Sequence, residues 1–185
     1  MASVFGYGSL VNHNTHIFER YRVAELRGWR REWVLTSLRP VVFLSARPCP
    51  NSTIWGLAAD VRDSDWAGLD ERERGYDRHA VDPFDRDGLP MLSGIQVYSV
   101  SEGVRATGGK GTIILSYLDV VVEGYLEHFG EAGVTAFFDT TDGWDTPVWD
   151  DRDAPVYPRH RIVSDQVRAQ VDSQLARLSA VVKQR

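Results

Sequence analysis

The sequence contains only one cysteine, Cys49, among its 185 residues. A single thiol excludes a disulfide within the chain. Cys49 stands between Pro48 and Pro50 with no histidine beside it, so the local sequence gives no support for a thiol nucleophile. The two prolines predict a loop here, between one strand over residues 41–45 and another over residues 53–61.

Long apolar runs are also missing. Hydrophobic residues make up 43% of the chain, enough for a substantial core. No uninterrupted apolar run approaches the roughly 18 residues that span a bilayer. The opening Met-Ala-Ser-Val-Phe-Gly has neither the charged segment nor the apolar core of a signal peptide. We therefore expect no membrane partner and a cytoplasmic location.

Basic charge is scarce as well. The net charge is −5, which argues against nucleic acid as the main partner, because nucleic-acid binding requires a basic face. Arg27, Arg30 and Arg31 form a local basic cluster interleaved with Trp29 and Trp33. The simplest interpretation is a strand whose apolar side chains face inward and whose arginines face outward.

Nucleotide-binding and metal-binding signatures are incomplete. Gly6-x-Gly8 is not followed by the third glycine of a dinucleotide fingerprint, and residues 108–112 lack phosphate-loop spacing. His13 and His16 have no third ligand nearby in the sequence, so solvated histidines are expected. The Asp-rich segment 139–153 lacks the ordered spacing of a calcium loop, and its role stays open. We expect no metal and no cofactor.

Strand patterns fill the first part of the chain and helical patterns the second. This order predicts an α+β fold rather than alternating βαβ units. The length fits one domain over residues 1–185, with a helical region from about residue 113. Beyond the strands over 41–45 and 53–61, we expect strands at 4–6, 22–36, 79–81 and 94–100, and helices at 12–20, 64–73, from 113 to 126, 134–138 and 164–182.

Two segments carry the chemistry. Phe5-Gly6-Tyr7-Gly8-Ser9-Leu10 predicts a strand that breaks into a loop, where glycines let backbone N–H groups approach an anion. Leu69-Asp70-Glu71-Arg72-Glu73 ends a predicted helix. Glu73 lies four residues after Leu69 and so shares the core-facing side, whereas Glu71 is expected to point away. An exposed charged helix end is the alternative interpretation of these carboxylates.

Together the two segments resemble the gamma-glutamylcyclotransferase superfamily, which carries a Tyr-Gly-Ser loop and a glutamate in a Leu-Asp-x-x-Glu context. Tyr117, seven positions before Gly124, resembles the family's Tyr-x6-Gly helix. The resemblance covers about the first 125 residues. The Phe-Gly-Tyr-Gly-Ser-Leu form is nearer the glutathione-specific branch, although Ile113 stands where that branch has serine.

The resemblance implies a small mixed or antiparallel β-barrel with flanking helices. It implies a cofactor-free enzyme that cyclises a small gamma-glutamyl amine or peptide to 5-oxoproline and releases the amine. Glu73 would be the catalytic residue, and the substrate-binding residues would be Tyr7, Gly8, Ser9, Leu10 and Tyr117. A non-catalytic binding module of the same fold, or a relative acting on a gamma-glutamyl-protected biosynthetic intermediate, remains an alternative. The oligomeric state stays open.

Overall fold

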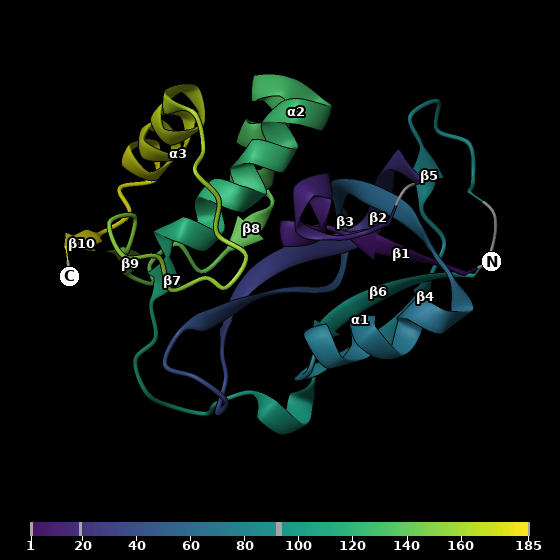
Figure 1. Cartoon of the computed structure of the whole chain (residues 1–185), viewed down its shortest axis with the longest axis horizontal. Coiled ribbons are helices and arrows are strands. Elements are labelled where there is room, and N and C mark those ends of the chain that lie inside the picture. Colours follow the sequence, from purple (N-terminus) through teal and green to yellow (C-terminus); the bar gives the residue numbers. More distant parts are fainter. Residues whose placement is uncertain (1, 19, 92–93, 185) are drawn as a thin grey trace.

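The computed structural model describes residues 2–18, 20–91 and 94–184. A mixed sheet forms the centre of the molecule, with the strand order β4-β6-β1-β3-β2-β5 and β8 added beside β2 (Figure 1). Its strands are β1 (Ala2–Gly6), β2 (Tyr21–Leu35), β3 (Val42–Val61), β4 (Tyr76–Val81), β5 (Phe84–Asp85), β6 (Ile95–Val100) and β8 (Thr141–Asp142). Most neighbours are antiparallel, while β1 runs parallel to β6 and β2 parallel to β8. The α+β class and the mixed sheet are confirmed. In the described part of the chain the end strands β4 and β5 do not pair with each other, so the sheet is not the closed barrel that the resemblance implied.

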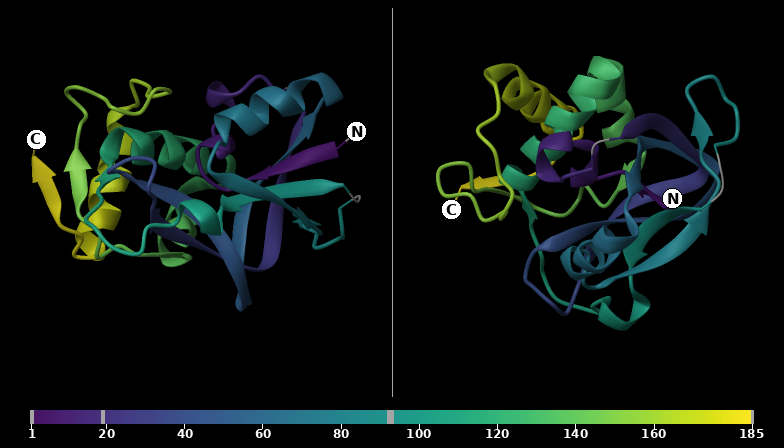
Figure 2. Two further views of the ribbon diagram at one scale, coloured as in Figure 1. Left: turned by 90° about the horizontal axis from the view of Figure 1, so that it is seen from below. Right: turned by 45° about the vertical axis from the view of Figure 1, so that its right-hand side comes forward.

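Two longer helices cover one side of the sheet. They are α2 (Leu115–Asp139) and α3 (Asp165–Arg177), which pack against each other, while the short α1 (Trp66–Arg72) lies across the molecule beside β6 and β4 (Figures 1 and 2). A second sheet of β7 (Ile113–Ile114), β9 (Val148–Asp150) and β10 (Val182–Gln184) stands near the start of α2. Single-turn 3₁₀ helices occur at η1 (Ser9–Val11), η2 (His13–Thr15), η3 (Asp63–Asp65) and η4 (Glu102–Val104).

Several helices lie where the sequence predicts them. Ser164 caps α3, because its side chain accepts a hydrogen bond from the N–H of Val167 at 3.3 Å. The two helical stretches predicted before and after residue 130 are the two parts of α2, which kinks at Gly130 with φ 65°. Two predictions were wrong. Asn12 caps only the single turn η2 rather than a helix, and residues 182–184 pair as β10 instead of continuing α3.

The predicted outward direction of Arg31 is also wrong. At Gly28, where φ is 77°, four residues of β3 stand opposite one residue of β2 between the pairs Arg27–Thr53 and Trp29–Pro48. A bulge reverses which side chains face inward, because strand side chains alternate with period two. Even-numbered residues such as Leu26 are therefore buried before the bulge, and Arg31 is buried after it, with 1% of its surface exposed.

The prolines around Cys49 lie inside a strand and not in the predicted loop. Residues 48–50 belong to the single long β3, so the two strands predicted at 41–45 and 53–61 are one. This part of β3 pairs only with β2, since β1 pairs with β3 farther on, at Leu57 to Val61. Its other edge is therefore free of ladder partners, which is where a strand tolerates proline.

The core joins the sheet to α2 and α3. Its fully buried members include Phe5, Leu57, Leu118, Tyr125 and Phe137. A smaller apolar cluster lies between β1, β3, β6 and α1 and contains Leu10 and Leu69. No helix in the described segments has an apolar stretch long enough to cross a membrane.

Close contact between α2 and η1 depends on Gly124. A Cβ atom at Gly124 would lie 2.7 Å from the backbone nitrogen of Asn12 and 2.8 Å from the carbonyl carbon of Val11. We expect Gly124→Ala to lower the free energy of unfolding by about 1–3 kcal/mol, because this overpacking outweighs the better helix propensity of alanine. Urea unfolding measures this change.

Gly68→Ala is the matched control. Gly68 also lies in a helix, but nothing stands within 4 Å of the Cβ position. Alanine there is expected to leave the protein equally stable or to stabilise it by up to about 1 kcal/mol. Equal unfolding midpoints for both variants would contradict the packing argument.

Candidate active site

The loop after β1 is held against the start of α2. Gly8 lies beneath Tyr117, so that a Cβ atom at Gly8 would approach the Tyr117 hydroxyl to 2.6 Å. Glycine is therefore required at position 8 for this close approach. Burial raises the pKa of Tyr117, while the Ser9 backbone opposes the rise.

The buried guanidinium of Arg31 holds the same loop by hydrogen bonds. Arg31 Nε donates to the carbonyl of Tyr7 at 3.1 Å, and the guanidinium also donates to Trp55 O, to the hydroxyl of Tyr125 and to Thr140 Oγ1. The Tyr125 hydroxyl lies 2.9 Å from Tyr7 O and 2.6 Å from Trp55 O, and its single hydrogen is donated to one of these carbonyls. Burial lowers the pKa of Arg31, and the dense set of oxygen acceptors offsets this cost.

Glu73 stands where α1 ends. Its N–H bonds to Leu69 O as the C-cap of the helix, and the chain then turns at Gly75, where φ is 99°. The turn directs Tyr76 back toward the sheet, and its hydroxyl donates to Leu44 O at 2.9 Å. Helix end and turn together place the Glu73 carboxylate between α1 and β3.

The Glu73 carboxylate is mostly shielded from water but has a cationic partner. Its side chain is 17% exposed, and Oε1 lies 3.0 Å from Arg72 Nε. Burial raises the pKa of Glu73, while Arg72 and Arg159 oppose the rise. Arg72 also donates to Thr15 O and to the Ser9 hydroxyl, so one guanidinium joins the predicted base to the predicted loop.

Glu73 lines a cavity of about 590 Å³, a size typical of small-molecule sites. One wall is apolar or aromatic and includes Phe43, Tyr76 and Tyr117. Basic residues stand around the cavity at positions 39, 72, 74 and 159. Glu71 points away from the core, as predicted, with 69% of its side chain exposed and paired with Arg74 at 2.5 Å, but it still borders the rim of the cavity.

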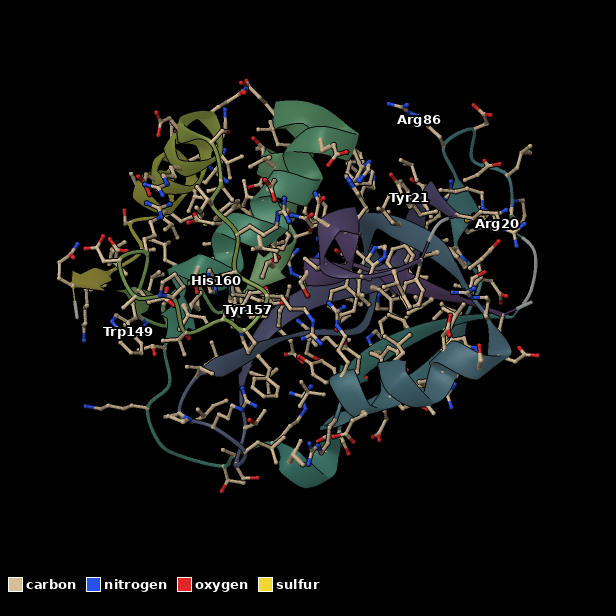
Figure 3. The ribbon with its side chains drawn as sticks, in the orientation of Figure 1. Arg20, Tyr21, Arg86, Trp149, Tyr157 and His160 are labelled. Atoms are coloured by element: carbon tan, nitrogen blue, oxygen red, sulfur yellow. The ribbon has the colours of Figure 1, made fainter. Side chains whose placement is uncertain are left out.

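The segment 151–164, here called the strap, crosses one side of the cavity with Tyr157, Pro158 and Arg159 (Figure 3). Its anchor is the buried Asp151, which accepts hydrogen bonds from the N–H and hydroxyl of Ser116 and from the N–H of Val156. The Tyr157 ring meets the Tyr117 ring edge-on with centroids 5.0 Å apart. One member of the Asp-rich segment thus fixes the strap to the first turn of α2.

The structure brings three of the six predicted site residues to the cavity, namely Ser9, Glu73 and Tyr117. Tyr7 and Gly8 lie behind them: the Tyr7 hydroxyl donates to Tyr98 O at 2.6 Å, and Gly8 supports Tyr117. The Leu10 side chain packs into the smaller apolar cluster and not into the cavity.

Most other cavity residues were missed by sequence reasoning, among them Arg72, Tyr76, Tyr157 and Arg159. Arg72 and Tyr76 are close to Glu73 in the sequence, so this proximity could have predicted that they lie at the same site. Tyr157 and Arg159 are more than 80 positions from Glu73 in a stretch without periodicity. Only the anchoring of the strap at Asp151 places them.

Comparison with known proteins identifies the family. The family model described as gamma-glutamyl cyclotransferase, AIG2-like, matches residues 4–110. A solved structure named gamma-glutamyl cyclotransferase superposes with a TM-score of 0.60 at 14% identity, covering 93% of this chain and 98% of that one. No curated protein matches the sequence closely enough to count as a relative.

Two further solved structures share the fold. An uncharacterized protein from Homo sapiens gives a TM-score of 0.59 at 15% identity, with 92% of this chain and 98% of that chain covered. YkqA from Bacillus subtilis gives 0.56 at 18% identity, with 77% and 56% covered. Because the family model spans more than half of the chain and includes both predicted motifs, the chain belongs to the gamma-glutamyl cyclotransferase, AIG2-like family.

Proposed function

We propose that this protein cyclises a small gamma-glutamyl amine or peptide to 5-oxoproline and releases the amine. The observation that carries the proposal is the Glu73 carboxylate, which is shielded in a cavity of substrate size beside Ser9 and Tyr117. Membership of the family and the shared fold support it.

The substrate supplies its own nucleophile. Its α-amine attacks its γ-carbonyl carbon, a new C–N bond closes the five-membered ring, and the old amide C–N bond breaks. Glu73 takes the proton from the attacking amine and passes it to the departing nitrogen, as a general base and then a general acid. No enzyme nucleophile is needed, so the cavity acts by holding the glutamyl arm in a folded conformation.

Neighbouring side chains position the Glu73 carboxylate and support the cavity around it. Arg72 holds one oxygen of Glu73 while bonding to the loop at Ser9 and Thr15, which makes Arg72 a positioning residue. The Tyr117 hydroxyl lies over Gly8 at the cavity and would donate its hydrogen to a substrate oxygen. Tyr7 and Tyr76 donate their hydroxyl hydrogens to backbone carbonyls and serve as supports.

The charges around the cavity favour substrates with a carboxylate. Arg72 and Arg74 are paired with Glu73 and Glu71. Neither Arg39 nor Arg159 forms an ion pair with a residue that the structure describes. These two guanidiniums are the groups available for an anionic substrate, whether the charge lies on the glutamyl α-carboxylate or on the released amine.

Glu73→Gln keeps the size of the side chain but removes its capacity to accept a proton. We expect kcat for 5-oxoproline release to fall by roughly 10²–10⁴-fold, the range of a general base. The assay measures 5-oxoproline from glutathione and from a panel of gamma-glutamyl amino acids and amines.

Glu102→Gln is the control for this variant. Glu102 is 90% exposed in η4 and stands outside the cavity, so its substitution should leave kcat unchanged. Parent protein that releases no 5-oxoproline from any substrate of the panel would favour a binding module of the same fold. Full activity in Glu73→Gln would exclude the proposed base.

The pH dependence of kcat/KM follows from the carboxylate. Glu73 acts only when deprotonated, and burial raises its pKa above the ordinary 4.5. Activity should therefore be lost as the pH falls through this raised value. In a profile of log(kcat/KM) against pH, an acidic limb at or below the ordinary value would contradict the assignment.

Arg159→Gln tests the strap. Because the Arg159 cation holds down the pKa of Glu73, its removal should move the acidic limb to higher pH. KM for substrates with a carboxylate on the leaving amine should rise by roughly two- to five-fold, since an exposed pair contributes up to about 1 kcal/mol. Uncharged amines should change less.

Arg86→Gln is the matched control, because Arg86 is an exposed arginine on the far side of the molecule, beside β5 (Figure 3). It should leave both KM and the pH profile unchanged. If Arg159→Gln behaves like this control, the strap does not contribute to substrate selection.

A further inference from the structure

A cluster of metal-ligating side chains lies outside the cavity, where η2 meets the middle of α2. His13 comes from η2, and Glu127 and His128 are consecutive residues of α2. One ligand atom from each residue lies within 4.8 Å of the other two. None of the three lines the cavity that holds Glu73.

Two imidazole nitrogens in this cluster lack a hydrogen-bond partner. His13 Nδ1 and His128 Nε2 are both shielded from solvent, and neither forms a hydrogen bond with the described part of the chain. His13 Nδ1 nevertheless lies 3.2 Å from Glu127 Oε2, too poorly aligned for a hydrogen bond. The His13 nitrogen and the Glu127 oxygen are thus close to each other without a hydrogen bond between them, as are two ligand atoms that share one metal ion.

The surroundings hold the two imidazoles in place. The Tyr21 ring stacks on His13 with centroids 5.9 Å apart and meets His128 edge-on at 5.3 Å. Glu127 is 42% exposed, so solvent has a path to the remaining coordination position.

We propose that His13, Glu127 and His128 bind a zinc ion, with water as the fourth ligand. Imidazole nitrogen and carboxylate oxygen are both zinc ligands, and bonds of about 2.0–2.1 Å in a tetrahedron place the ligand atoms roughly 3.3 Å apart. The His13–Glu127 distance of 3.2 Å already has this spacing. The three ligand atoms now lie within 4.8 Å of one another, and a small rotation of the His128 side chain would bring its nitrogen to the same spacing.

His16 is not a member of this set, although the sequence pairs it with His13. His13 instead lies beside Glu127 and His128 of α2, more than a hundred positions away in the sequence. The ion would tie η2 to α2 and take no part in the cyclisation, which contains no Lewis-acid step.

The test is a zinc titration of the full chain against a chromogenic chelator. We expect one saturable site and an unfolding temperature that rises with zinc concentration. His13→Gln and His128→Gln should each weaken binding by more than the roughly 10–100-fold that loss of an outer-shell partner costs. In the absence of zinc, both variants should have the same unfolding temperature as the parent.

Two controls exclude other ligands. His79→Gln removes an exposed histidine of β4 that bonds to Ser99, and Cys49→Ser removes the only thiol; both should bind zinc as the parent does. The proposal is overturned if no saturable site appears, or if His13→Gln and His128→Gln bind zinc like His79→Gln. Addition of a chelator should leave 5-oxoproline release unchanged, and this readout separates the zinc site from the proposed reaction.

Discussion

The guanidinium of Arg31 lies in the interior between β2 and α2, where it donates to the carbonyls of Tyr7 and Trp55 and to Tyr125. A buried cation without a paired carboxylate is costly unless every donor finds an acceptor. Those acceptors come from the loop after β1, from β3, from α2 and from Thr140, which lies between α2 and β8. The loop cannot move without leaving part of this charge unsatisfied, so its position against Tyr117 is fixed by the core.

The cavity is assembled on this fixed loop from two other directions. Arg72 reaches Ser9 and Thr15 from the end of α1 and brings Glu73 with it. The strap comes from the C-terminal part of the sequence, and Asp151 accepts two hydrogen bonds from Ser116 that hold it in place. Burial raises the pKa of Glu73, and Arg72 and Arg159 oppose this rise, so both the end of α1 and the strap act on the same carboxylate.

Sequence reasoning succeeded where the cause was local. The break after β1, the end of α1 near Glu73, the Ser164 cap and the two parts of α2 follow from glycine, capping and helical periodicity over a few residues. It failed where the cause was a pairing between distant segments. The bulge at Gly28 reversed the direction of Arg31, and an edge position let Pro48 and Pro50 remain within β3.

The sequence by itself determined the α+β class and the family motifs, because each lies in a short pattern that its neighbours specify. Of the six site residues that the resemblance implied, Ser9, Glu73 and Tyr117 line one cavity. The tertiary structure alone decided that Leu10 packs in a core, that Arg159 faces Glu73, and that His13 meets His128. These outcomes depend on contacts between residues far apart along the chain. Such contacts are selected by packing and burial of the whole fold, which no short pattern in the sequence encodes.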